Sequence, residues 1–110
     1  MNITERSQNG ITVFELDGRV DSHGAMNMDT VLLAAVAAGK HKLVLDMGKV
    51  DYISSAGLRT LADVVTRNRQ AGGDVKLVAV NRRVLRVLRI IGFDKFFTLH
   101  DTVDAAVADF

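Results

Sequence analysis

Two adjacent serines, Ser54 and Ser55, are the residues of this sequence that are best placed for chemistry. They come shortly after the apolar segment of residues 43–45, and they precede an apolar repeat with helical spacing. A hydroxyl group at a helix N-terminus lies near unpaired backbone N–H groups and the positive end of the helix dipole, where a phosphate group is stable. The pair is therefore a candidate phosphorylation switch, and a serine in this position also serves as an ordinary N-cap.

Other features of the sequence give little support for an enzyme. The chain has no cysteine, which excludes disulfide bonds, thiolate catalysis and cysteine-based zinc sites. Its three histidines are dispersed without the spacing of metal ligands, and the serines do not lie in the G-x-S-x-G motif of serine hydrolases. We therefore expect no catalytic residue, no metal site and no cofactor of the protein's own.

Length and composition indicate a single small domain. A chain of 110 residues can bury one core, and we expect one domain spanning residues 1–110. The longest apolar run, residues 31–38, is far shorter than the roughly 20 residues that cross a bilayer, and no secretory leader is recognisable. A net charge of +1 gives no general attraction to nucleic acid or anionic membranes. We expect a cytoplasmic protein without direct nucleic-acid or membrane contacts.

The apolar pattern predicts strands and helices that alternate behind an N-terminal hairpin. Asn9-Gly10 is a strong turn signal between two extended segments, residues 2–8 and 11–16. Helices are predicted at residues 25–38, from the serines to about residue 70, around residues 84–91, and from Asp101 onward. The intervening strands are expected at residues 43–45, 75–80 and 97–99. This order indicates an α/β domain with a mixed sheet, about four helices and right-handed crossovers.

Several segments resemble the STAS-domain anti-sigma factor antagonists, which are small bacterial regulators controlled by serine phosphorylation. The segment YISSAGLR at residues 52–59, with LVLD at residues 43–46, is similar to the signature of this family. Residues 16–21 match its L-x-G-x-x-D element, and residues 75–80 and 90–93 fall where the family has its last buried strand and a helix end. The serine that is phosphorylated in the family aligns with Ser55. Many relatives carry Asp or Asn at the position of Ser54, which remains the alternative acceptor.

The resemblance implies a mechanism of partner switching in transcription regulation and signal transduction. The unphosphorylated protein would bind a cognate anti-sigma factor with serine kinase activity and so release the sigma factor. The kinase would then phosphorylate Ser55 with ATP, and a PP2C-type phosphatase would restore the active form; ATP and metal belong to these partners. The resemblance places Asp21 beside the switch serine, so the expected partner-binding residues are Asp21, Ser54, Ser55 and Gly57.

Several alternatives remain open from the sequence. Asp21 could cap the helix that follows it or form part of the partner surface. The protein could instead be a STAS docking subunit of a stress-signalling scaffold or of a lipid-transport complex. Gly57 could serve tight packing, or its missing side chain could let a kinase's nucleotide approach the serine. The arginines on one face of the third predicted helix could form a solvated face or contact an acidic partner, and they are Arg82, Arg83, Arg86 and Arg89.

Overall fold

The computed structural model describes residues 1–110 and contains one five-stranded sheet with the order β1-β2-β3-β4-β5. Its antiparallel part is the predicted hairpin of β1 (Asn2–Gln8) and β2 (Ile11–Asp17). The turn between them uses Asn9 and Gly10 at φ values of 53° and 79°, which these two residue types tolerate best. The other strands run parallel to β2, and they are β3 (Lys42–Lys49), β4 (Asp74–Val78) and β5 (Thr98–His100).

Five helices connect or follow the strands: α1 (Ser22–Ala37), α2 (Ser55–Gln70), α3 (Arg82–Ile90), α4 (Phe93–Phe96) and α5 (Val103–Ala108). The expected α/β fold with an N-terminal hairpin and a mixed sheet is confirmed. α4 is an addition to the predicted helices, because four residues are too few to show a helical repeat. β4 ends at Val78, before the predicted residue 80, because Ala79 takes a left-handed conformation with φ of 56°.

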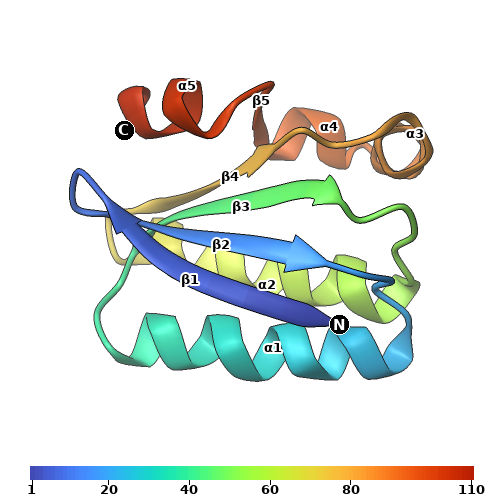
Figure 1. Cartoon of the computed structure of the whole chain (residues 1–110), viewed down its shortest axis with the longest axis horizontal. Coiled ribbons are helices and arrows are strands. Elements are labelled where there is room, and N and C mark those ends of the chain that lie inside the picture. The colour runs from blue at the N-terminus through green and yellow to red at the C-terminus, as the bar shows by residue number, and fades with distance from the viewer.

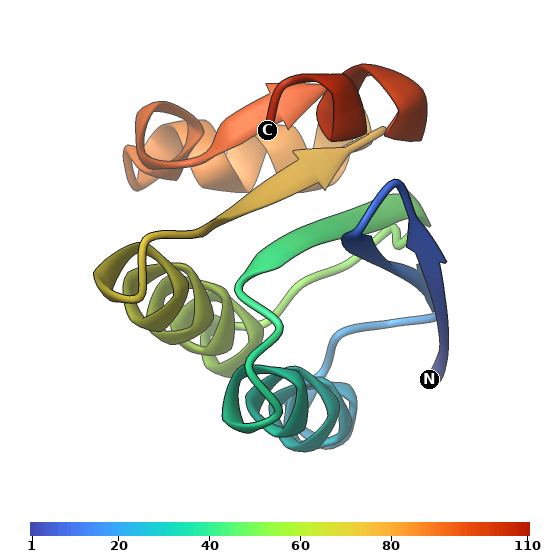
Figure 2. The same cartoon turned by 90° about the vertical axis from the view of Figure 1, so that its left-hand side faces the viewer.

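The helices cover the two faces of the sheet unequally. Figure 1 shows the long helices α1 and α2 together below the sheet and the short helix α5 above it. Figure 2 shows the same layers from the side, with α1 and α2 lying next to each other. The main core fills the space between these two helices and the sheet, and its largest buried side chains include Phe14, Leu32, Leu45 and Leu61. A smaller core, which includes Val44, Val78 and Val107, lies under α5. β3 is therefore covered on both faces, as its continuous apolar run predicted.

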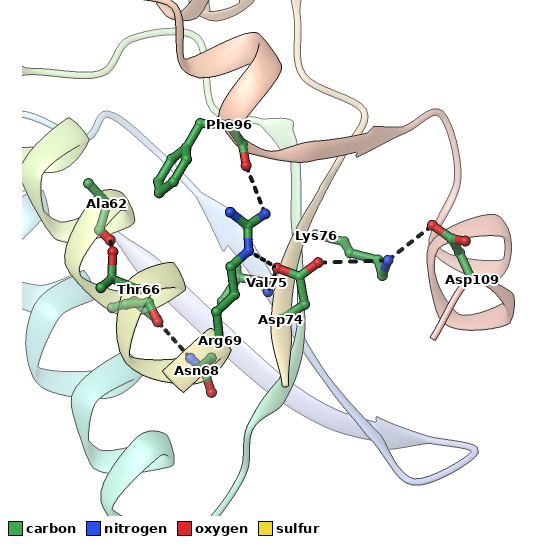
Figure 3. A network of polar contacts seen from close by, with 10 residues as sticks. Ala62, Thr66, Asn68, Arg69, Asp74, Val75, Lys76, Phe96 and Asp109 are labelled. Atoms are coloured by element: carbon green, nitrogen blue, oxygen red, sulfur yellow. Dashed lines mark hydrogen bonds and ion pairs between the residues drawn. The ribbon is translucent and has the colours of Figure 1, made fainter. Parts of the chain in front are cut away.

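A polar network runs across β4 and links the C-terminal end of α2 to Asp109, the residue that follows α5 (Figure 3). Arg69 Nε lies 2.8 Å from Asp74 Oδ1, and Lys76 Nζ lies 3.0 Å from Asp109 Oδ2. The Lys76 side chain is only 7% exposed, and the Asp74 and Asp109 carboxylates are its ion-pair partners. Hydrogen bonds from Lys76 and, less strongly, from His100 lower the pKa of Asp109 below its ordinary value of 3.8. The network joins α2, β4 and α5 at the opposite end of α2 from the two serines.

Candidate functional site

The two serines occupy different positions at the start of α2. Ser54 is the N-cap, with extended backbone angles, and its Oγ accepts a hydrogen bond from the Gly57 backbone N–H at an N···O distance of 3.2 Å. Ser55 is the first helical residue; it is exposed, and its hydroxyl takes part in none of the side-chain hydrogen bonds of the structure. The capping function and the free hydroxyl therefore belong to separate residues.

The loop before the serines is hydrogen-bonded to the connection between β2 and α1. Val20 and Ile53 form an isolated parallel bridge, in which the Ser54 N–H donates to the Val20 carbonyl at 2.7 Å. The Val20 N–H donates in turn to the Tyr52 carbonyl at 2.9 Å. These bonds hold the N-termini of α1 and α2 next to each other. A binding partner that reaches Ser55 therefore also meets the start of α1.

Asp21 is the N-cap of α1 and lies just after this bridge. Its carboxylate is exposed and accepts a hydrogen bond from the Gly24 backbone N–H at 2.8 Å. This hydrogen bond lowers the pKa of Asp21 below 3.8; desolvation opposes the shift, and the positive charge of Arg19 adds to it. Asp21 is consequently a charged acceptor at the surface that the bridge brings close to the serines.

Gly57 lies in the first turn of α2 and is buried. A Cβ atom at this position would lie 2.5 Å from Val20 Cγ1 and 2.8 Å from Ile53 Cγ1, which is closer than real side chains approach. The absence of a side chain thus lets α2 pack directly on the bridge. The structure gives Gly57 the packing role that the sequence left open, and its part in partner binding stays a prediction.

Three exposed side chains that were not among the predicted site residues lie around this site. The Arg19 guanidinium lies over the Tyr52 ring, with its Cζ atom 4.3 Å from the ring centre, and Tyr52 remains 41% exposed. Met26 on α1 is 70% exposed and lines a groove of about 460 Å³ between α1 and α2. The stacked pair joins residues far apart in the chain, so no local pattern could have found it. Exposed aromatic, methionine and arginine side chains are typical of protein interfaces.

Asn81 connects α3 to the loop that precedes the serines. Its amide oxygen accepts from the Val84 N–H at 2.9 Å as the N-cap of α3, and its Nδ2 donates to the Val50 carbonyl at 2.7 Å. A second groove, of about 160 Å³, lies between this loop and α3 and is lined by Arg19, Tyr52 and Arg83, among others. The strand ends, the serines and the start of α3 therefore form one continuous edge of the molecule.

The chemistry of this edge suits binding and modification. No group of three or more His, Cys, Asp or Glu side chains lies close enough together to hold a metal ion. None of the helices has the length and apolar composition needed to cross a membrane. The site offers an exposed hydroxyl, a neighbouring carboxylate, and two helix N-termini held rigidly together.

Comparison with known proteins identifies the family. The sequence profile of the STAS domain matches residues 2–106. The chain belongs to the STAS domain family. This STAS domain is 36% identical over its whole length to BtrV of Bordetella bronchiseptica, which is provisionally named an anti-sigma factor antagonist, and the match covers 95% of BtrV. It is 28% identical to the anti-sigma-F factor antagonist RsfB of Mycobacterium tuberculosis, over 97% of this chain and 87% of RsfB.

The fold agrees with a solved relative. The crystal structure of an anti-sigma factor antagonist from Mycobacterium paratuberculosis superposes with a TM-score of 0.88 at 27% identity. The superposition covers 98% of this STAS domain and 92% of the relative. The resemblance seen in the sequence segments is thus confirmed over almost the entire chain.

Proposed function

We propose that this STAS domain is an anti-sigma factor antagonist that acts in the cytoplasm by partner switching. In this proposal the unphosphorylated domain binds a cognate anti-sigma factor with serine kinase activity and so releases the sigma factor. The names of BtrV and RsfB support the general function. The observation that carries the proposal is that the two serines have different structural roles. Ser54 caps α2, and Ser55 presents a free, exposed hydroxyl.

The proposed switch is the transfer of one phosphoryl group to Ser55. The Ser55 Oγ attacks the γ-phosphorus of ATP on the kinase, the bond to the leaving ADP breaks, and the hydroxyl proton passes to a base of the kinase. A phosphoserine carries about −1.5 to −2 charges at neutral pH. The formal charge of the domain would therefore change from +1 to about −1 at one point of the binding surface.

The position of Ser55 explains how such a charge would release the partner without unfolding the domain. The first turn of α2 contains no acidic residue, so its free N–H groups and dipole can accommodate the phosphate. The partner instead meets a new charge on the surface that also carries the Asp21 carboxylate and the exposed Tyr52 and Met26 side chains. A PP2C-type phosphatase would reverse the change by hydrolysing the phosphoester.

The experiment that tests this proposal is incubation with a candidate anti-sigma factor and Mg-ATP, followed by intact-mass measurement and mapping of the modified residue. We expect one phosphoryl group on Ser55, which is lost in Ser55→Ala and kept in Ser54→Ala. Ser22→Ala is a matched control, because Ser22 is the exposed first residue of α1. Phosphorylation should also abolish binding of the factor.

Two outcomes would contradict the proposal. Stoichiometric phosphorylation of Ser55→Ala would move the acceptor to Ser54 or elsewhere. Binding that is the same with and without ATP, together with no modification by any candidate kinase, would favour the docking role in a scaffold or transport complex.

A further inference from the structure

Helix α3 carries an unusual concentration of unpaired positive charge. Its nine residues include four arginines and no acidic residue, and the arginines are Arg82, Arg83, Arg86 and Arg89. All four are exposed, and none takes part in an ion pair or a side-chain hydrogen bond. By contrast, Arg67 and Arg69 on α2 are paired with Asp63 and Asp74, the latter pair being visible in Figure 3. We call the four side chains on α3 the arginine face.

The stability of the fold does not account for the arginine face. Arg82 and Arg83 lie in the first turn of α3, where a positive charge opposes the helix dipole. Arg86 lies three or four residues from each of the other three arginines, so like charges are neighbours on the helix surface. α3 is held by the buried side chains of Val84 and Leu88 and by the Asn81 cap. Arg89 lies in the last turn, where its charge suits the helix dipole, but the other three arginines are costly to the isolated helix. Their presence favours a role outside the domain.

The arginine face continues into the surface that contains the serines. Arg83 lines the groove of about 160 Å³ together with Arg19 and Tyr52. Val84 and Val87 form part of the floor, so the groove combines apolar contacts with two guanidinium groups. Figure 1 shows α3 beside the loop that leads from β3 to α2. A partner centred on Ser55 is thus within reach of α3.

We propose that a carboxylate-rich surface of a protein partner docks on the arginine face and the adjoining groove. The proposal rests on the proposed function, since it assigns this chemistry to the anti-sigma factor surface that faces Ser55. Guanidinium groups bind carboxylates through two parallel hydrogen bonds, and arginine is enriched in protein interfaces. Ile90 follows Arg86 by one helical turn and is 75% exposed, which adds an apolar contact to the charged ones.

The local charges favour a protein over a membrane or a nucleic acid. Asp51 lines the groove with Arg83, and Asp94 lines a neighbouring hollow with Arg89. These carboxylates would repel a continuous phosphate surface, whereas a protein can place single carboxylates opposite single arginines. Because the whole chain has a net charge of only +1, the part outside α3 is net negative and adds to this repulsion.

An acidic partner surface would also explain why phosphorylation of Ser55 weakens binding. Carboxylates that bind Arg19 and Arg83 would lie near the start of α2, where a phosphate on Ser55 adds charge of the same sign. The phosphate would repel these carboxylates, and it would also compete with them for the nearest guanidinium groups. Unphosphorylated Ser55 leaves both arginines to the partner.

The test compares the double variant Arg83→Gln, Arg86→Gln with the wild type and with Arg6→Gln. Arg6 is a matched control, because it is exposed and unpaired on β1, on a different part of the surface. Each protein is titrated against the anti-sigma factor identified by the phosphorylation assay, at about 50 mM and about 300 mM salt. We expect the double variant to bind about tenfold more weakly at low salt and to lose much of the salt dependence, because two exposed charge pairs are removed. Arg6→Gln should bind like the wild type, and circular dichroism should show that all three are folded.

The failure of this inference is distinguishable from the failure of the proposed function. A factor that binds the double variant as tightly as the wild type, with the same salt response, overturns the inference and leaves the switch intact. If no anti-sigma factor binds the wild type, the proposed function fails, and an octaglutamate peptide serves as the probe. Changes in the NMR chemical shifts of the α3 backbone amides on addition of this peptide support the inference, and their absence refutes it. Tighter binding of the arginine face to phosphatidylglycerol vesicles or duplex DNA than to the peptide also overturns it.

Discussion

Replacing Ser54 and Ser55 one at a time by alanine should separate the stability of the domain from its phosphorylation. Ser54→Ala removes the acceptor of the Gly57 N–H, and Gly57 is buried, so water replaces this bond poorly. Loss of a serine N-cap costs about 1 to 2 kcal/mol, which lowers the Tm of a domain of this size by about 4 to 8 °C. The same variant keeps Ser55 and should be phosphorylated normally.

Ser55→Ala should show the reverse behaviour. Its hydroxyl contributes no hydrogen bond to the fold, so the free energy of unfolding should change by less than about 0.5 kcal/mol. Phosphorylation should be abolished. Ser54→Asp is a useful control for the cap, because a carboxylate also accepts from the Gly57 N–H and suits the helix N-terminus.

Thermal unfolding followed by circular dichroism, with phosphorylation followed by intact mass, measures both properties on the same samples. The reasoning fails if Ser55→Ala loses as much stability as Ser54→Ala, since that would mean that Ser55 has a structural bond. It also fails if folded Ser54→Ala, at a temperature well below its Tm, is no longer a kinase substrate.

Three further changes test other parts of the molecule. Gly57→Ala places a methyl group 2.5 Å from Val20 Cγ1 and should lower the free energy of unfolding by about 1 to 3 kcal/mol. An unchanged midpoint of urea-induced unfolding would contradict the packing described. Ser55→Asp should keep the circular dichroism spectrum and Tm of the wild type but weaken anti-sigma factor binding about a hundredfold, or about 3 kcal/mol. Binding as tight as that of the wild type would show that charge alone is not the switch. The Asp109 carboxyl has a pKa below its ordinary value of 3.8 in the folded state. Its ion pair with Lys76 therefore stabilises the fold fully above about pH 3.8. This contribution is lost as the pH falls through the lower pKa of the folded state. Asp109→Asn should therefore reduce the acid-induced loss of stability below about pH 4, and denaturation curves that fall in parallel for both proteins would exclude this role.

Local patterns in the sequence predicted most of the fold. Asn9-Gly10 indicated the hairpin because its backbone requirement is strictly local, and residues 43–45 indicated a strand covered on both faces. The apolar pattern did not predict features that depend on a single dihedral angle or on very few residues. The left-handed Ala79 ends β4 early, and α4 is too short to have a period.

The candidate site was predictable in position but not in detail. The residues around Ser54 and Ser55 carry a family signature, so the sequence indicated the correct helix start. It left the capping residue open, because helix boundaries are uncertain by a residue or two, and the two serines are chemically identical. The stacking of Arg19 on Tyr52 and the bridge between Val20 and Ile53 join distant segments, and only the folded chain brings them together.

The bridge between Val20 and Ile53 has a consequence for how a kinase recognises its substrate. The Val20 and Ser54 amide protons are hydrogen-bonded although they lie in connecting loops, so they should exchange slowly with deuterium. Ser55 is therefore presented on a rigid folded epitope assembled from two segments of the chain, and binding requires little ordering of this loop. A short synthetic peptide covering residues 50–60 lacks Val20 and the start of α1. Such a peptide should be a poor substrate, which distinguishes this mode of recognition from that of kinases that read an extended sequence.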